Sequence, residues 1–138
     1  MKQSVSHYVM PDEKEEATAE LVHRLGLDGI ENLIYGDEPS SNLFTSLTVG
    51  AHLRFWPRWM DFYLGNTKRY KKQFPDEKAL TAYYGASDTD GWLEEIRKNI
   101  RAALAEKPEY LVWHVADCTL EEAWTRQFYY TSKDVLRE

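Results

Sequence analysis

Four segments of the chain have the hydrophobic pattern of β-strands. Residues 3–9 and 29–35 are short runs rich in β-branched and aromatic side chains, and turn-forming residues follow each of them. Residues 110–117 are almost continuously apolar, which is typical of a strand buried on both faces of a parallel sheet. Residues 48–55 alternate instead, with a period of two. This alternation places Val49, Ala51, Leu53 and Phe55 on one face and Gly50, His52 and Arg54 on the other.

Helical periodicity occurs between some of these expected strands. Asp12 opens a D-x-x-E capping box that predicts the start of a helix, and Gly26 stands where a glycine typically follows a helix end. Asp88 or Asp90 is expected to cap a longer helix that ends near residue 105. We expect the apolar stripe of this helix to pack on the outer face of the third and fourth strands. The residues expected to make that contact are Trp92, Ile96, Ile100 and Leu104.

Residues 56–84 have no single period and are interrupted near Pro57, Gly65 and Pro75, which predicts two or three short helices. Aromatic side chains gather at the start of this region. We expect them to form a small separate core, with the covering of a ligand as the alternative. They are Phe55, Trp56, Trp59, Phe62, Tyr63 and Tyr70.

The expected elements follow the order strand, helix, strand, loop, strand, irregular helices, helix, strand. This order predicts an α/β protein of parallel βα units joined by right-handed crossovers rather than by hairpins. A chain of 138 residues with 43% hydrophobic residues is long enough for one domain with a core and too short for two ordinary domains. We therefore expect residues 1–138 to form a single domain with about four parallel strands, whereas a closed barrel of such units needs eight.

Composition excludes several classes of protein. The net charge is −6 and the basic residues are scattered, whereas a nucleic-acid surface needs a concentrated basic face. The single cysteine, Cys118, cannot form an internal disulfide bond and fits a reducing compartment. No apolar run approaches the roughly 20 residues of a membrane helix, and the first residues lack the features of a signal peptide. We expect a cytoplasmic protein without a membrane partner.

Each expected strand carries a candidate metal ligand: His7, Glu31, His52 and His114. The carboxyl ends of parallel strands carry the chemistry of α/β folds, and imidazole with carboxylate suits Zn, Mn or Fe. We predict that His52 and His114 face the same space within roughly 10 Å, because neighbouring strands lie about 4.8 Å apart. The alternatives remain open: a lone strand histidine is often a hydrogen-bonded core residue, and Glu31 could pair with Arg54.

Two further residues are candidate substrate contacts. Arg54 follows the third strand, where a guanidinium group could bind a phosphate or carboxylate, and Trp56 comes next in the same aromatic loop. Pairing of the basic residues of this region with surface carboxylates is the simpler interpretation. No glycine-rich nucleotide loop and no serine-hydrolase elbow occurs in the sequence.

Four blocks of the sequence resemble a known group of enzymes: GLDGIENLIYG, VGAHLRFWPRWMDFYLGN, ALTAYYGASD and PEYLVWHVADCTLEEAWTRQFYYT. They are similar to the xylose-isomerase-like TIM-barrel superfamily, in particular to sugar phosphate isomerase/epimerase-like proteins of bacteria. The resemblance implies a divalent metal (Zn, Mn, Fe or Co) at the barrel mouth and the interconversion of sugars or sugar phosphates. It matches Glu31 to an acidic residue after the second strand, and His52 and His114 to polar positions that end the next two strands. Because a whole barrel takes roughly 250 residues, the resemblance implies that residues 1–138 are the N-terminal half of a TIM (β/α)8 barrel.

The first expectation is therefore a metal-dependent isomerase or epimerase in which Glu31 moves the proton and His52 and His114 bind the metal. The alternative is a non-catalytic half-barrel fragment or binding module that assembles with a second copy or with a missing C-terminal half. An apurinic-site nuclease, another activity of the superfamily, is disfavoured by the acidic charge. A half-barrel exposes an apolar inner face, here with Val5 and Val112, and two strand edges. We therefore expect a homodimer or other oligomer.

Overall fold

The structure is a computed structural model that describes residues 2–56, 59–66, 68 and 74–114. Among the residues discussed above, Pro57, Tyr70 and Cys118 lie outside these ranges, as does the end of the expected fourth strand. The chain divides into two compact units, which are described separately. The first unit comprises residues 1–54 and 96–113, and the second comprises residues 55–95 and 114–138.

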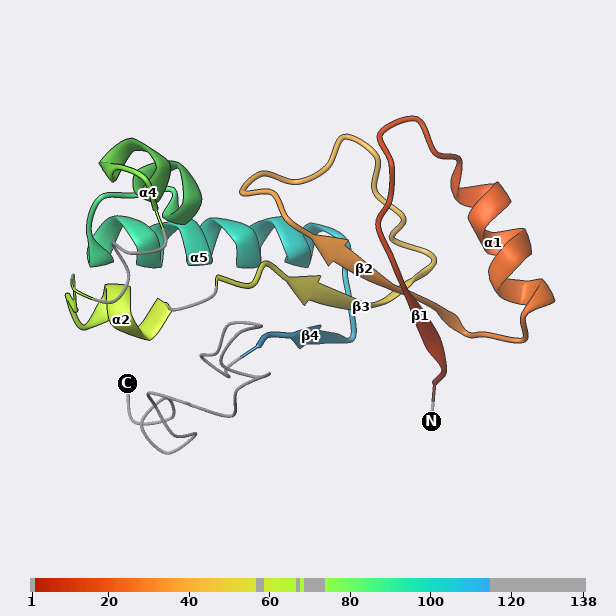
Figure 1. Cartoon of the computed structure of the whole chain (residues 1–138). Coiled ribbons are helices and arrows are strands. Elements are labelled where there is room, and N and C mark those ends of the chain that lie inside the picture. Colours follow the sequence, from red (N-terminus) through yellow and green to blue (C-terminus); the bar gives the residue numbers. More distant parts are fainter. Residues whose placement is uncertain (1, 57–58, 67, 69–73, 115–138) are drawn as a thin grey trace. The chain divides into compact units, whose positions relative to one another are not determined.

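The first unit is built on a sheet of four parallel strands (Figure 1). The strands lie in the order of the sequence, β1-β2-β3-β4, and each pairs in parallel with the next. They are β1 (Ser4–His7), β2 (Gly29–Ile34), β3 (Thr48–Leu53) and β4 (Tyr110–Val112). Each lies within a segment that the hydrophobic pattern predicts to be a strand. The α/β fold class with about four parallel strands is therefore confirmed.

Two helices belong wholly or partly to the first unit: α1 (Glu15–Arg24) and the C-terminal part of α5 (Thr89–Ala105). The capping box predicted at Asp12 is wrong, because α1 starts after Lys14 without a side-chain cap. The predicted cap of α5 is confirmed, since Asp88 accepts a hydrogen bond of 2.8 Å from the backbone of Gly91. In the part of the chain described here, no helix has both the length and the apolar character that crossing a bilayer requires.

Both helices cover the same face of the sheet. Val22 of α1 packs with Ile30 of β2, and Ala103 of α5 packs with Ala51 of β3. Ala51 is the register partner of Asn32, which is two residues from Ile30 and therefore points to the same side of the sheet. Val5 is in register with Ile30 and also belongs to this side. The expectation that Val5 points into the uncovered inner face is therefore wrong.

The expected stripe of α5 is only partly correct. Ile100 packs against the cluster that contains Ala51 and Leu53, as predicted. Leu104 is 53% exposed, and the ring of Trp92 packs among aromatic residues of the second unit. The reason is the length of α5, which contains residues of both units. Its first turns belong to the second unit and pack against residues of that unit.

The second unit has an aromatic core. Its helices are α2 (Trp59–Tyr63), α4 (Glu77–Tyr84) and the first turns of α5. Trp59 stacks on Trp92 with ring centroids 5.7 Å apart, and Phe62 stacks on Tyr84 at 4.1 Å. Trp56 meets the edge of Trp92 at 6.1 Å. The predicted aromatic core is therefore confirmed for the described residues.

A buried carboxylate fixes the long connection between β2 and β3. Glu106 is fully buried just after α5, and it accepts hydrogen bonds from the backbone of Phe44 at 2.9 Å, from Thr48 at 3.2 Å and from Asn32 at 3.1 Å. Burial raises the pKa of the Glu106 carboxyl above its ordinary value, although these three hydrogen bonds act in the opposite direction. The connection, which contains no helix, is thus anchored by one side chain distant in sequence.

Candidate functional site

The face of the sheet opposite the helices carries a row of polar side chains. Ser6, Glu31, Gly50 and Tyr110 are successive register partners across the four strands, so they point to the same side. His52 lies two residues beyond Gly50 and shares this side. We call this side the polar face.

Glu31 lies at the centre of the polar face, where it accepts hydrogen bonds from β1 and β4 and lies beside His52 of β3. Its Oε1 is 3.3 Å from Nδ1 of His52 and 3.4 Å from the hydroxyl of Ser6, which donates to it. Its Oε2 accepts from the hydroxyl of Tyr110 at 3.3 Å. The side chains of Glu31 and His52 are 18% and 22% exposed. The carboxylate is thus held by hydrogen bonds from two strands, has the imidazole of His52 beside it and still meets solvent.

The contacts of Tyr110 show that the polar face is concave. Its hydroxyl on β4 is 3.2 Å from the hydroxyl of Ser4 on β1. In a flat sheet, three strand spacings of about 4.8 Å would separate these strands, more than the two side chains together can span. The sheet therefore curves toward the polar face and away from α1 and α5.

Gly50 makes this contact possible. A β-carbon at Gly50 would lie 2.4 Å from ring atoms of Tyr110, so the ring occupies the space that any other residue would fill. The ring crosses β3 at this point and places its hydroxyl beside Glu31 and Ser4.

Of the predicted site residues, the structure brings Glu31 and His52 together. Arg54 follows β3, and its backbone N–H donates to Asn99 at 3.0 Å. Trp56 is 3% exposed in the second unit and donates its indole N–H to the carbonyl of Tyr83 at 3.2 Å. His114 also belongs to the second unit, where its ring centroid is 5.3 Å from that of Phe55. The proximity of His52 and His114, and substrate contacts by Arg54 and Trp56, therefore stay predictions.

Metal binding by this face requires more donors than it displays. Glu31 and His52 provide one carboxylate and one imidazole, whereas zinc sites have three or four protein ligands. Within the described ranges, no group of three or more His, Cys, Asp and Glu side chains is arranged to hold a metal ion. The polar face alone therefore does not complete a metal site.

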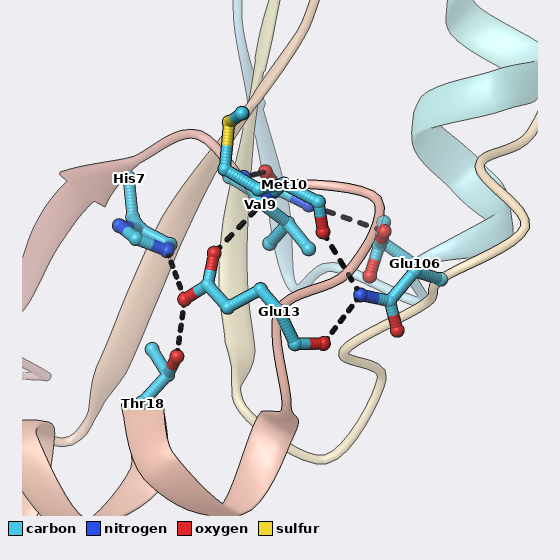
Figure 2. A network of polar contacts seen from close by, with 8 residues as sticks. His7, Val9, Met10, Glu13, Thr18 and Glu106 are labelled. Atoms are coloured by element: carbon cyan, nitrogen blue, oxygen red, sulfur yellow. Dashed lines mark hydrogen bonds and ion pairs between the residues drawn. The ribbon is translucent and has the colours of Figure 1, made fainter.

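His7, the remaining strand-end histidine, belongs to a different cluster (Figure 2). It is in register with Asn32 on the helix-covered side, and its Nε2 is 2.7 Å from Oε1 of Glu13. Thr18 donates to the same oxygen, and the backbone of Met10 donates to Oε2 at 3.0 Å. Burial raises the pKa of Glu13, but the bonds from Thr18, Met10 and His7 outweigh it and hold that pKa below its ordinary value. His7 and Glu13 join the end of β1 to α1.

The sequence interpretation missed the hydroxyl groups of the polar face. Ser4 and Ser6 alternate with Val5, so the period of two within residues 3–9 was the available signal. Tyr110 stands two residues before Val112 in a segment that reads as continuously apolar, and nothing in its own neighbourhood marks it as polar in function. Its role depends on the glycine at position 50 of another strand.

Comparisons with known proteins add no relative. No protein-family model matches the chain, no curated protein matches it, and no solved structure matches it.

Proposed function

We propose that the polar face is the acid–base site of an isomerase or epimerase that acts on a small sugar or sugar phosphate. The observation that carries the proposal is the Glu31–His52 pair at 3.3 Å, on a concave face with the hydroxyl of Tyr110 on the other carboxylate oxygen. Isomerisation of a hydroxy carbonyl compound through an enediol, the route proposed here, needs a base that removes a proton from carbon and an acid that returns it. Glu31 is the base, and His52 orients it.

The hydroxyl groups around Glu31 suit a polyhydroxylated substrate. Ser4, Ser6 and Tyr110 each present an O–H that can both donate and accept. In this proposal they exchange their hydrogen bonds to one another and to Glu31, of 3.2 to 3.4 Å, for bonds to substrate hydroxyls. Arg54, which follows β3, is the proposed contact for a phosphate group.

The arrangement of the sheet supports a relation to TIM barrels. Sequential strand order with the helices on one face and a concave opposite face is the arrangement of barrel strands. Doubly wound sheets differ, because their strand order reverses and helices cover both faces. We therefore propose that the chain is the N-terminal half of a xylose-isomerase-like barrel, with the polar face as the inner wall.

A divalent metal, Zn, Mn, Fe or Co, belongs to this proposal only if a third donor joins Glu31 and His52. His114 is the candidate that the sequence offers. When bound, such an ion would polarise the carbonyl and hydroxyl oxygens of the substrate. The proton transfer assigned to Glu31 does not depend on it.

The test is exchange of carbon-bound hydrogen, which needs no knowledge of the product. The full chain is incubated in D₂O with a panel of aldoses, ketoses and their phosphates, with each of the four metals and without metal. Proton magnetic resonance then detects deuterium that has entered at the carbon beside the carbonyl. We expect exchange with at least one member of the panel and a loss of at least about 100-fold in Glu31→Gln, as expected for removal of a general base.

The matched control is Glu20→Gln, which replaces an exposed glutamate of α1. It should leave the exchange rate unchanged, and circular dichroism should show that both variants are folded. Absence of exchange with every compound, under every metal condition, would reject the isomerase proposal.

A partner that completes the barrel is part of the same proposal. Among the described strands, β1 and β4 each pair on one side only, and such edges readily accept another chain. We propose a homodimer, in which a second copy covers the polar face and supplies further donors. Sedimentation at micromolar concentration should then give twice the mass of 16.2 kDa. A dimer without hydrogen exchange would favour the non-catalytic binding module, and a stable monomer would reject the dimer.

A further inference from the structure

A second concave site lies at the carboxyl ends of β1 and β2, on the side of the sheet that α5 covers. It is a pocket of about 190 Å³ within the first unit. Asn32 and Ala102 line it and are buried, each 2% exposed, whereas Tyr8 and Tyr35 line it and are about half exposed. The carboxyl ends of parallel strands are the usual place for ligands in α/β folds.

Hydrogen bonds from α5 fix the wall of the pocket. Asn99 of α5 is 2% exposed and donates to the carbonyls of Ile34 at 3.0 Å and Gly36 at 2.6 Å, both of which line the pocket. The backbone that follows β2 is therefore fixed to α5. The pocket is preformed rather than a transient gap between loops.

The charge of the pocket selects its ligand. Glu38 is the one acidic residue among the ten that line it, and none of the ten is Lys, Arg or His. The rings of Tyr8 and Tyr35 stand at 47° to each other with centroids 5.7 Å apart, so they form a corner. A cation within about 6 Å of a tyrosine ring is attracted by the negative face of the ring. The carboxylate and both rings therefore favour positive charge.

The side chain of Asn32 at the floor of the pocket offers a polar contact. The described bonds of the Asn32 amide are one from Nδ2 to Glu106 at 3.1 Å and one to Oδ1 from the backbone of Val9 at 3.5 Å. The second bond lies at the upper limit of hydrogen-bond length, and one amide hydrogen has no part in either. Asn32 can thus bind a hydroxyl group that reaches the floor.

We propose that this pocket binds a small organic cation, with its ammonium group in the corner of Tyr8 and Tyr35 beside Glu38 and a hydroxyl group at Asn32. The volume limits the ligand, because pockets for drug-sized molecules start at roughly 300 Å³. A molecule of the size of choline or ethanolamine fits this limit. The site is distinct from the polar face, so it does not depend on the isomerase proposal.

The experiment compares choline with 3,3-dimethyl-1-butanol, a neutral molecule of nearly the same shape. Each is titrated into the full chain labelled with ¹⁵N, and the backbone amide shifts of Tyr35 and Gly36 report binding. We expect choline to shift these amides and to bind at least about 5-fold more tightly than the neutral molecule, given two ring contacts and a carboxylate. Equal affinities would overturn the cation assignment, and absence of shifts with choline would overturn the site.

Two variants and two controls locate the contact. Glu38→Gln removes the charge and Tyr35→Leu removes a ring face, and each should weaken choline binding about 2- to 5-fold. Tyr8→Phe keeps the ring and should bind like the wild type, as should Glu20→Gln, which removes an exposed carboxylate of α1. Unchanged binding in both Glu38→Gln and Tyr35→Leu, with the folds intact, would reject the proposed contacts.

Discussion

The ring of Tyr110 lies against Gly50 so closely that a β-carbon at Gly50 would stand 2.4 Å from ring carbons Cε2 and Cζ. Through this contact a residue of the last described strand reaches Glu31 of the second and Ser4 of the first. One missing side chain thus permits a polar network that extends across the whole sheet.

Gly50→Ala should therefore displace Tyr110 and break its bonds to Glu31 and Ser4. We expect a loss of about 1–3 kcal/mol in the free energy of unfolding, the usual cost of overpacking. Urea denaturation measures it. Gly36→Ala is the control, because a β-carbon there has its nearest neighbour at an ordinary 3.5 Å.

A double-mutant cycle separates the clash from a general effect of the substitution. In a Tyr110→Ala background the ring is absent, so Gly50→Ala should cost much less than in the wild type. Equal costs in the two backgrounds would show that Tyr110 does not occupy the space beside Gly50.

Glu106 should give the stability a pH dependence of its own. Its raised pKa means that the folded chain binds the proton more tightly than the unfolded chain. The free energy of unfolding should therefore fall as pH rises from the ordinary carboxyl pKa to the raised pKa of Glu106. In Glu106→Gln this decline should disappear, although the loss of an acceptor lowers the stability at every pH.

Urea denaturation at intervals between pH 4 and 8 gives the free energy of unfolding as a function of pH. The slope of this curve tests the prediction, whereas its vertical offset reflects the lost acceptor. Glu16→Gln, at an exposed position of α1, gives the effect of removing a surface carboxylate. A Glu106→Gln curve parallel to that of the wild type would contradict the prediction.

Glu13 should make the free energy of unfolding depend on pH in the opposite direction. Its lowered pKa means that the unfolded chain binds the proton more tightly, so its contribution is complete above the ordinary carboxyl pKa. That contribution is lost as pH falls through the lowered pKa. Glu13→Gln should cost about 1–3 kcal/mol near neutral pH, because it weakens the bonds to His7, Thr18 and Met10. Thermal unfolding of both proteins should show the difference shrinking in acid, and a constant difference would argue against it.

Ile100 and Leu104 test which part of α5 holds the sheet. Ile100→Ala should cost about 2 kcal/mol, near the lower end for such truncations, because Ile100 packs against Ala51 and Leu53 but is only partly buried. Leu104→Ala should cost less than about 0.5 kcal/mol, since Leu104 is 53% exposed. Similar losses for the two variants in guanidinium denaturation would mean that α5 packs differently.

The elements that follow a local period could be predicted from the sequence. Alternation in residues 48–55 placed Ala51 and His52 on opposite faces of the strand, and this agrees with the structure. Glu31 and His52 could each be identified as a candidate site residue from the strand that carries it, without knowledge of the other strand.

Features that depend on distant partners could not be predicted. Trp92 has the spacing of a residue that faces the sheet, yet aromatic rings from residues 56–84 provide its contacts. Asp12 has the spacing of a helix cap, but the neighbouring Glu13 binds His7 and Thr18, and the helix begins later. Periodicity gives the face of a residue and not the identity of what packs there.

The anchoring of the β2–β3 connection has a consequence for the order of folding. Phe44 and Thr48 depend on Glu106, 62 and 58 residues further along the chain, so their hydrogen bonds close only after α5 has formed and docked. Such contacts between distant residues form slowly, because the entropy of closing the intervening loop is lost first. In pulse-labelling hydrogen exchange, the amide of Phe44 should gain protection late, together with the strand interior rather than with α1. The time at which this one amide becomes protected therefore reports when the first unit has completed its folding.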